Sequence, residues 1–261
     1  MGTLSNQIHF TIRGDKHQPV LLFLHGFLGN CEDFDAIVPH LSNNFCCLSI
    51  DLPGHGQTQV AEENYTMSNT AELIVQLLDR LDISQCHLVG YSMGGRLALY
   101  LALQFPDRFP KTVLESASPG LKTESERLAR KQYDETLADR LESGFPKFLA
   151  DWYEQPLFRS LKQHPTFEQI FQQRLQNRPL ELARSLRYLG TGEQPSLWDQ
   201  LKLYQNPLLL LVGECDRKFI TINQEMAHLC KTAHLEIIPN VGHTTHIEDA
   251  QTFANHVREF L

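Results

Sequence analysis

The sequence predicts an α/β protein with a mostly parallel central sheet, helices on both faces and a helical insertion over one edge. Short apolar runs alternate with segments of helical periodicity, and this alternation stops between residues 120 and 200. The length of 261 residues allows one full core plus an inserted cap. With 42% apolar and 21% charged residues, the composition is that of a globular chain.

Seven short runs are predicted strands. Residues 8–13 alternate between polar and apolar, which is typical of an antiparallel edge strand. The other runs are mostly apolar, as strands buried on both faces of a parallel sheet are. They occupy residues 20–25, 46–51, 86–91, 112–115, 208–213 and 235–239.

Between these strands the apolar residues follow a helical period. Residues 67–81 place four leucines on one face, and residues 94–105 place Leu97, Leu101 and Phe105 on one face. Residues 253–261 form the last predicted helix. We therefore expect an α/β core made of residues 1–119 and 201–261.

Residues 120–200 are predicted to form a helical cap. The segment is rich in charged and aromatic side chains and has few strand-like runs. It is inserted between two core strands, so it should cover the carboxyl edge of the sheet, where open α/β sheets bind ligands.

Charge and hydropathy disfavour two classes of partner, nucleic acids and membranes. Lys+Arg is 23 and Asp+Glu is 31, and the net charge of −8 disfavours a general nucleic-acid or anionic-membrane binder. Apolar runs such as 20–24 span five residues, far short of the about 20 needed to cross a membrane. The polar residues 1–6 lack the features of a signal peptide. We expect a cytoplasmic protein.

The six cysteines predict free thiols rather than disulfides or a metal site. None forms a Cys-x-x-Cys pair, and no cluster has the spacing of zinc ligands. Buried free thiols are typical of a reducing compartment.

Residues 90–94 read Gly-Tyr-Ser-Met-Gly, a G-x-S-x-G motif. A predicted strand precedes the motif and a predicted helix follows it. In this context the motif is typical of a nucleophile elbow, a strained turn that exposes the hydroxyl of Ser92. The flanking glycines allow neighbouring backbone to approach closely.

A nucleophilic serine needs a base, and the base needs a carboxylate that orients it. Asp216 follows one predicted strand and His243 follows the next, so both should lie at the same sheet edge as Ser92. Glu214 is the alternative acid, but it lies closer to its strand end. His246 is the alternative base, but we expect it in the following helix, at the surface or behind the site.

An oxyanion site needs backbone donors that are already in place. The N–H of Met93, directly after the serine, is one candidate, and the N–H of Phe27 is the other. His25, Asp51 and His55 also lie in loops at strand ends. We expect these three side chains to brace their loops rather than to catalyse.

Together these motifs resemble the α/β-hydrolase fold family over essentially the whole chain. The resemblance rests on 25–27 (His-Gly-Phe), 51–56, 90–94, Asp216 and 242–243 (Gly-His).

Further motifs resemble one family with this fold, the 2-succinyl-6-hydroxy-2,4-cyclohexadiene-1-carboxylate (SHCHC) synthases of menaquinone and phylloquinone biosynthesis. Arg96 follows the elbow, and the other matching segments are 115–121, 126–130, 151–158 and 213–219.

This resemblance implies that Arg96 and Arg130 bind substrate carboxylates, with Arg127 as the weaker alternative to Arg130. It also implies that Tyr91, Trp152 and Tyr153 line the pocket. Arginine suits bidentate binding of carboxylates. Without the resemblance, the arginine on the charged cap helix would indicate a solvated surface. The aromatic pair of Trp152 and Tyr153 would then indicate packing within the cap.

The reaction that the resemblance implies is elimination of pyruvate from a polycarboxylate small molecule, without a metal or organic cofactor. Ser92 would take a proton beside a ketone, and backbone N–H groups would hold the enolate oxygen. The same triad would also suit a serine hydrolase of carboxylic esters or carbon–carbon bonds. A ligand receptor that retains catalytic residues is a further alternative.

Overall fold

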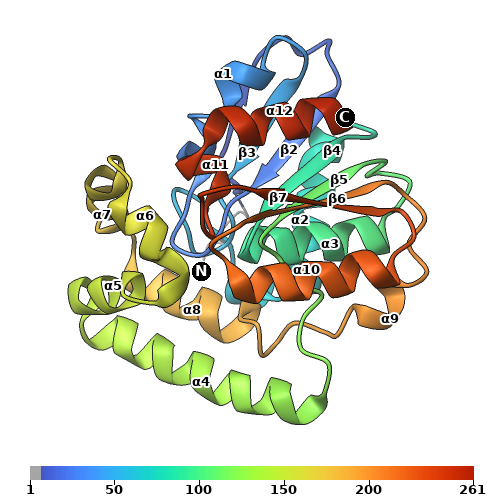
Figure 1. Cartoon of the computed structure of the whole chain (residues 1–261). Helices are drawn as coiled ribbons and strands as arrows, with labels where there is room; N and C mark the ends of the chain where they lie inside the picture. Colours follow the sequence, from blue (N-terminus) through green and yellow to red (C-terminus); the bar gives the residue numbers. More distant parts are fainter. Residues whose placement is uncertain (1–6) are drawn as a thin grey trace.

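The computed structural model describes residues 7–261, which fold around one seven-stranded sheet (Figure 1). Residues 1–6, on which the expectation of no signal peptide rests, lie outside the described residues. The strands follow the spatial order β1-β3-β2-β4-β5-β6-β7. Their bounds are β1 Phe10–Arg13, β2 Val20–Leu24, β3 Cys46–Ile50, β4 His87–Tyr91, β5 Thr112–Glu115, β6 Leu208–Gly213 and β7 Ala233–Ile238.

Neighbouring strands run parallel, except that β1 pairs antiparallel with β3. The predicted parallel sheet with an antiparallel edge strand is therefore confirmed. β7 differs from the predicted 235–239, because Ala233 and His234 already pair with Leu208 and Leu209 of β6. β7 lies at the sheet edge and begins with the half-buried Ala233 and the exposed His234, so its first two residues carry no strong apolar signal.

Two layers of helices cover the sheet, as predicted (Figure 1). Side chains of β2 alternate between the two cores that result: Leu22 and Leu24 join one, and Leu21 and Phe23 join the other. The first face carries α2 (Met67–Arg80), α3 (Met93–Gln104) and α10 (Arg217–Leu229), and the second carries α1 (Val38–Leu41) and α12 (Ala250–Phe260).

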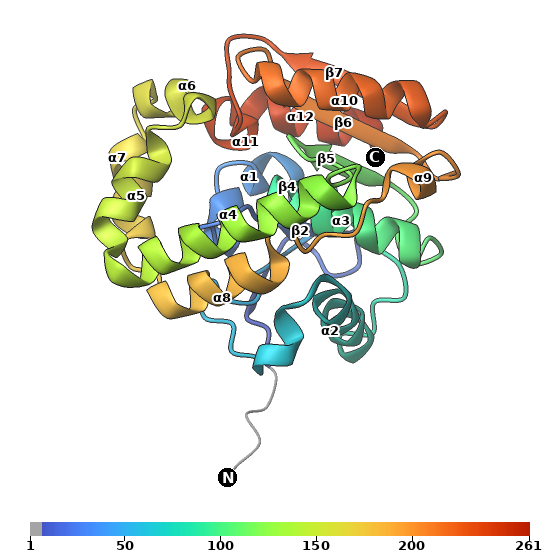
Figure 2. The ribbon, with the colours of Figure 1, turned by 90° about the horizontal axis from the view of Figure 1, so that it is seen from below.

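A helical insertion lies between β5 and β6 and packs across one side of the core (Figure 2). Leu137, Phe148 and Leu182 help to form a buried apolar cluster within it. Its helices are α4 (Glu124–Ser143), α5 (Phe145–Tyr153), α6 (Arg159–Gln163), α7 (Phe167–Arg174) and α8 (Pro179–Leu189). The insertion also contains the short segment η3 (Pro156–Phe158), and short helical segments elsewhere are η1 (Cys31–Phe34), η2 (Glu62–Tyr65), α9 (Trp198–Leu201) and α11 (Thr245–Glu248).

Polar contacts fix the insertion on the loop that follows β2. Arg174, at the end of α7, forms a buried ion pair of 2.7 Å with Asp33 of η1. The Asn177 side chain donates to the Leu28 carbonyl at 2.8 Å. Breaking a buried ion pair leaves an uncompensated charge and costs about 3–5 kcal/mol. The insertion is therefore held in one position over the carboxyl edge of the sheet.

Within residues 7–261, no helix combines the length and the apolar character that crossing a bilayer demands. All six cysteines are free thiols, and the prediction that they are buried fails at one of them. Cys215 is exposed and the others are buried.

Candidate active site

Ser92 occupies a strained turn between β4 and α3. Its φ of 50° and ψ of −105° lie in a region that residues with a side chain rarely adopt. A Cβ at position 94 would lie 2.1 Å from the carbonyl oxygen of Leu24, and one at position 90 would lie 2.7 Å from Cβ of Ala98. Only glycine permits both approaches, which is the geometry expected of a nucleophile elbow.

The structure brings Ser92, His243 and Asp216 into one hydrogen-bonded line. His243 Nε2 lies 3.0 Å from Ser92 Oγ, and His243 Nδ1 lies 2.5 Å from Asp216 Oδ2. His243 and Asp216 are buried, whereas Ser92 is partly exposed. A base bonded to both hydroxyl and carboxylate can take the serine proton and be stabilised as an imidazolium.

The two alternative residues lie apart from this line. Glu214 is exposed and accepts a hydrogen bond from the Asn240 N–H at 3.0 Å. His246 is fully buried, and its Nδ1 lies 2.7 Å from Oε2 of Glu115. Of the two positions expected for His246, the surface one is wrong and the one behind the site is confirmed, because Glu115 at the end of β5 gives the ring a buried partner.

Two carboxylates anchor the loop that carries His243. Glu248 accepts hydrogen bonds from the Gly242 N–H at 3.0 Å and from the Thr244 hydroxyl at 2.7 Å. Glu115 accepts one from the Thr245 hydroxyl at 2.6 Å. Sequence reasoning missed both roles. A glutamate that ends a buried apolar strand, as Glu115 does, was the available signal.

The two predicted oxyanion donors border one cavity with Ser92. Met93 is the first residue of α3, and N–H groups of a first helical turn have no acceptor within the helix. The N–H of Phe27 makes no hydrogen bond to any residue that the structure describes. Both donors are therefore free to bind an oxygen that carries developing negative charge.

Two buried histidines brace the loop around Phe27, as predicted. His25 Nε2 accepts from the Leu52 N–H at 2.9 Å, and His55 Nε2 accepts from the Leu28 N–H at 3.2 Å. Each Nδ1 lies at hydrogen-bond distance from a backbone carbonyl. One nitrogen must accept and the other donate, so both rings are neutral. Burial lowers the pKa of both side chains.

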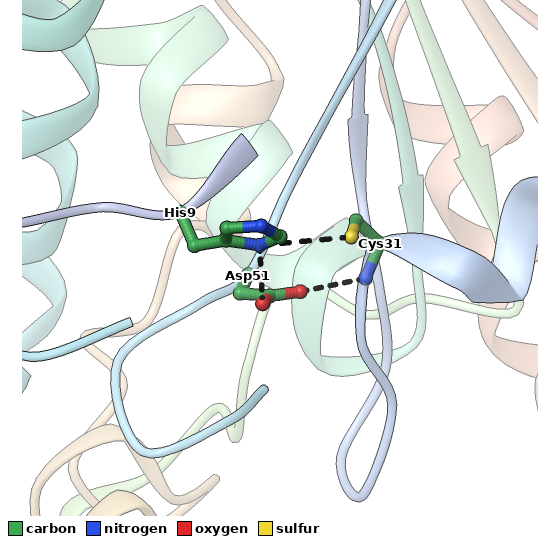
Figure 3. Close-up of side chains that lie close together, drawn as sticks. All are labelled: His9, Cys31 and Asp51. Carbon is green, nitrogen blue, oxygen red and sulfur yellow. Dashed lines mark hydrogen bonds and ion pairs between the residues drawn. The ribbon is translucent and has the colours of Figure 1, made fainter. Parts of the chain in front are cut away.

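His9, Cys31 and Asp51 form a compact group outside the cavity (Figure 3), and their donor atoms lie within 4.8 Å of one another. The oxygens of Asp51 already accept from His9 Nδ1 at 2.8 Å and from the Cys31 N–H at 2.7 Å. Burial and the nearby carboxylate raise the pKa of Cys31 to about 12, which opposes formation of a thiolate ligand. This group has the geometry of a hydrogen-bonded brace, as expected for Asp51.

A cavity of about 420 Å³ lies over Ser92, between the core and the insertion. Phe27, Ser92 and His243 border it from the core, and Trp152 and Leu186 border it from the insertion. A largely apolar lining with a few convergent polar groups is typical of small-molecule sites.

Positively charged side chains on the cavity wall distinguish it from an apolar acyl pocket. Arg96 is 9% exposed, and burial together with the charge of Arg130 lowers its pKa to about 10. Arg130 Nε forms an ion pair of 2.7 Å with Asp134 Oδ1. Arg127 does not border the cavity, so the geometry favours Arg130 over it.

Sequence reasoning missed Lys218, which borders the same cavity although the residue as a whole is exposed. Partial burial and repulsion from Arg130 lower its pKa. Its position two residues after Asp216 was the signal that could have found it.

The predicted aromatic residues separate into two groups. Tyr91 and Trp152 border the cavity, and the Trp152 ring lies 5.2 Å from the Phe27 ring. Tyr153 does not line the cavity as predicted but packs at 5.0 Å against Phe158 in the core of the insertion. Successive helix residues point about 100° apart, so adjacent side chains of α5 face different surroundings.

Comparison with known proteins identifies relatives over nearly the full chain. The family model described as alpha/beta hydrolase fold matches residues 19–250. A Bacillus subtilis (strain 168) protein, provisionally named 2-succinyl-6-hydroxy-2,4-cyclohexadiene-1-carboxylate synthase, is 37% identical over 99% of this chain and 97% of its own. The synthase of that name from Serratia proteamaculans (strain 568) is 33% identical, over 95% of each chain. The structure of MenH from S. aureus superposes with a TM-score of 0.92 at 37% identity, covering 97% of both chains.

We expect Ser92 and His243 to act as one unit. Ser92→Ala and His243→Ala should each lower kcat by about a hundredfold to ten-thousandfold, with the melting temperature unchanged. The double variant should be little slower than either single variant, because each substitution already removes the proton transfer. Losses that multiply in the double variant would contradict the assignment.

We also expect the protein to lose stability below about pH 6.5, where unfolded histidine takes up a proton. His25 and His55 are held neutral in the folded state, so their pKa values are lowered there. Each histidine then lowers the free energy of unfolding by at most about 1.4 kcal/mol per pH unit as the pH falls. Urea denaturation between pH 7 and pH 5 measures this slope.

His55→Gln should make the pH slope shallower, because one of the two histidines is gone. The control is His17→Gln, which changes an exposed side chain and should leave the slope as it is in the wild type. An unchanged slope in His55→Gln would show that His55 is not held neutral.

Proposed function

Because the chain belongs to the α/β-hydrolase fold family, we propose that it is a carbon–oxygen lyase of this fold with SHCHC synthase activity. It would convert 2-succinyl-5-enolpyruvyl-6-hydroxy-3-cyclohexene-1-carboxylate into 2-succinyl-6-hydroxy-2,4-cyclohexadiene-1-carboxylate and pyruvate. The relatives at 33% to 37% identity that carry this name support the proposal. The reaction would serve menaquinone or phylloquinone biosynthesis in the cytoplasm.

The observation that carries the proposal is the positive charge of the cavity above Ser92. The substrate has three carboxylates, on its ring, its succinyl chain and its enolpyruvyl group. Four cationic side chains border the cavity, Arg96, Lys122, Arg130 and Lys218, against two carboxylates, Glu126 and Glu225. Lys122 is paired with Glu225, which leaves Arg96, Arg130 and Lys218 as three cationic groups for the substrate. Arg96 is buried and has no carboxylate partner among residues 7–261, which is costly unless a ligand supplies one. An esterase for simple neutral acyl groups has no need of this arrangement.

The triad would act as a base. Ser92 Oγ takes the proton from the ring carbon beside the succinyl ketone, while its own proton moves to His243 Nε2 at 3.0 Å. The N–H groups of Phe27 and Met93 stabilise the enolate oxygen that forms. Asp216 stabilises the imidazolium of His243.

Collapse of the enolate expels the leaving group. The electron pair returns through the ring double bond, and the carbon–oxygen bond to the enolpyruvyl group breaks. The ring becomes a conjugated diene. The departing enolate of pyruvate takes up the proton held by the triad, so atoms and charges balance without water.

We expect stoichiometric release of pyruvate from the enolpyruvyl substrate, with the second product absorbing as a conjugated diene. Ser92 only moves a proton in this reaction, so mass spectrometry of rapidly quenched enzyme should show unmodified protein. Apart from exchange at the pyruvate ketone, neither product should gain oxygen from labelled water. A trapped ester on Ser92, or fast turnover of simple esters without pyruvate release, would favour a serine hydrolase instead.

We expect Arg96→Ala and Arg130→Ala each to lower kcat/KM by about tenfold to a hundredfold, because each loses a hydrogen-bonded ion pair with a carboxylate. Arg96→Lys should restore activity only in part, because lysine lacks the planar fork. Arg127→Ala is the matched control on the same helix, and it should behave like the wild type. Near-normal kcat/KM in both alanine variants would remove these arginines from the site.

A further inference from the structure

Gln194 is a buried amide behind the cavity wall. Its side chain is 1% exposed and lies in the loop between α8 and α9. Its Oε1 accepts a hydrogen bond from Arg96 Nη1 at 3.2 Å, and its Nε2 donates to the Ser118 carbonyl at 3.3 Å. A guanidinium only donates and a carbonyl only accepts, so these contacts fix the orientation of the amide. Gln194 thus links the loop after β5 to Arg96.

Neutral acceptors alone hold the Arg96 guanidinium. Its Nη2 donates to the carbonyl of Leu189, the last residue of α8, at 3.1 Å. Such a carbonyl has no donor within its helix and carries a partial negative charge. Within residues 7–261, no carboxylate lies at ion-pair distance from Arg96. Arg96 therefore keeps a fixed position and a net positive charge.

The acidic group that acts on Arg96 from farther away is already engaged. Asp134 raises the pKa of Arg96, but its oxygens bind Arg130 Nε at 2.7 Å and the Gly192 N–H at 3.0 Å. Arg130 is thus partly neutralised within the protein. Arg96 is the buried arginine whose charge is left for a ligand.

We propose that Gln194 is a positioning residue, which holds Arg96 at the cavity wall and leaves its positive charge available to a carboxylate of the substrate. The inference deepens the proposed function and rests on it only for the identity of the anion. A glutamate at position 194 would have nearly the same shape as glutamine. It would also form an ion pair with Arg96 and compete with any anionic ligand.

The test compares Gln194→Glu with the wild-type enzyme. Isothermal titration with succinate, a dicarboxylate, gives a Kd that does not depend on catalysis, and pyruvate release gives KM and kcat. We expect the Kd for succinate and the KM to rise by about tenfold to a hundredfold, with kcat within about threefold of wild type. The melting temperature should stay the same or rise, because the new carboxylate meets a buried cation.

Two further variants sharpen the result. Gln194→Met keeps the length of the side chain but removes both hydrogen bonds, so Arg96 keeps its charge and loses its support. We expect succinate binding about tenfold weaker and a lower melting temperature. Gln104→Glu makes the same charge change at the exposed end of α3, where Gln104 donates to Gln200. This control should bind succinate as the wild type does.

The proposal is overturned if Gln194→Glu binds succinate within twofold of wild type, or if the Gln104→Glu control weakens binding equally. If Gln194→Glu does not fold, Gln194→Met takes its place, and a Kd for succinate within twofold of wild type in that variant overturns the proposal. Weakened succinate binding in an enzyme that releases no pyruvate would refute the proposed function alone. Pyruvate release with unchanged succinate binding in Gln194→Glu would refute the role of Gln194 alone.

Discussion

The close approach of α3 to the end of β2 at Gly94 is the constraint on which the site depends. A Cβ there would lie 2.1 Å from the Leu24 carbonyl oxygen, so no larger residue fits without displacing backbone. This approach places the N–H of Met93 beside the loop that carries Phe27. Ser92, two residues earlier in the same turn, holds a strained conformation with a positive φ. The parallel sheet then brings the loops of Asp216 and His243 to the same edge, because parallel strands all end there.

The insertion encloses the space above Ser92 at this edge of the sheet. Its buried contacts with the core, such as Arg174 with Asp33, hold it over the triad and enclose a cavity. The chain carries a net charge of −8, yet arginine and lysine side chains converge on that cavity. Carboxylates such as Asp134 partly neutralise Arg130, whereas Arg96 is held by an amide and a carbonyl. The distribution of charge, rather than its total, therefore favours an anionic ligand.

Local patterns predicted the features that depend on neighbouring residues in the chain. Alternation and apolar runs predicted the sheet, and the starts of the two edge strands, β1 and β7, were each misplaced by two residues. Roles that depend on packing were harder to predict. Tyr153 turns into the core of the insertion, and His246 is buried against Glu115. In both cases the deciding partner is distant in the sequence, so no local pattern records it.

The sequence by itself determined the fold class, the elbow at Ser92 and the order of serine, acid and histidine. These features follow from the periodicity of apolar residues and from the glycines beside the serine. Both are local signals, because they depend on residues only a few positions apart. Only the tertiary structure decided that Arg130 rather than Arg127 faces the cavity, that Lys218 joins it and that Gln194 supports Arg96. The physical reason is that the direction of a side chain and the compensation of its charge depend on segments that meet only after folding.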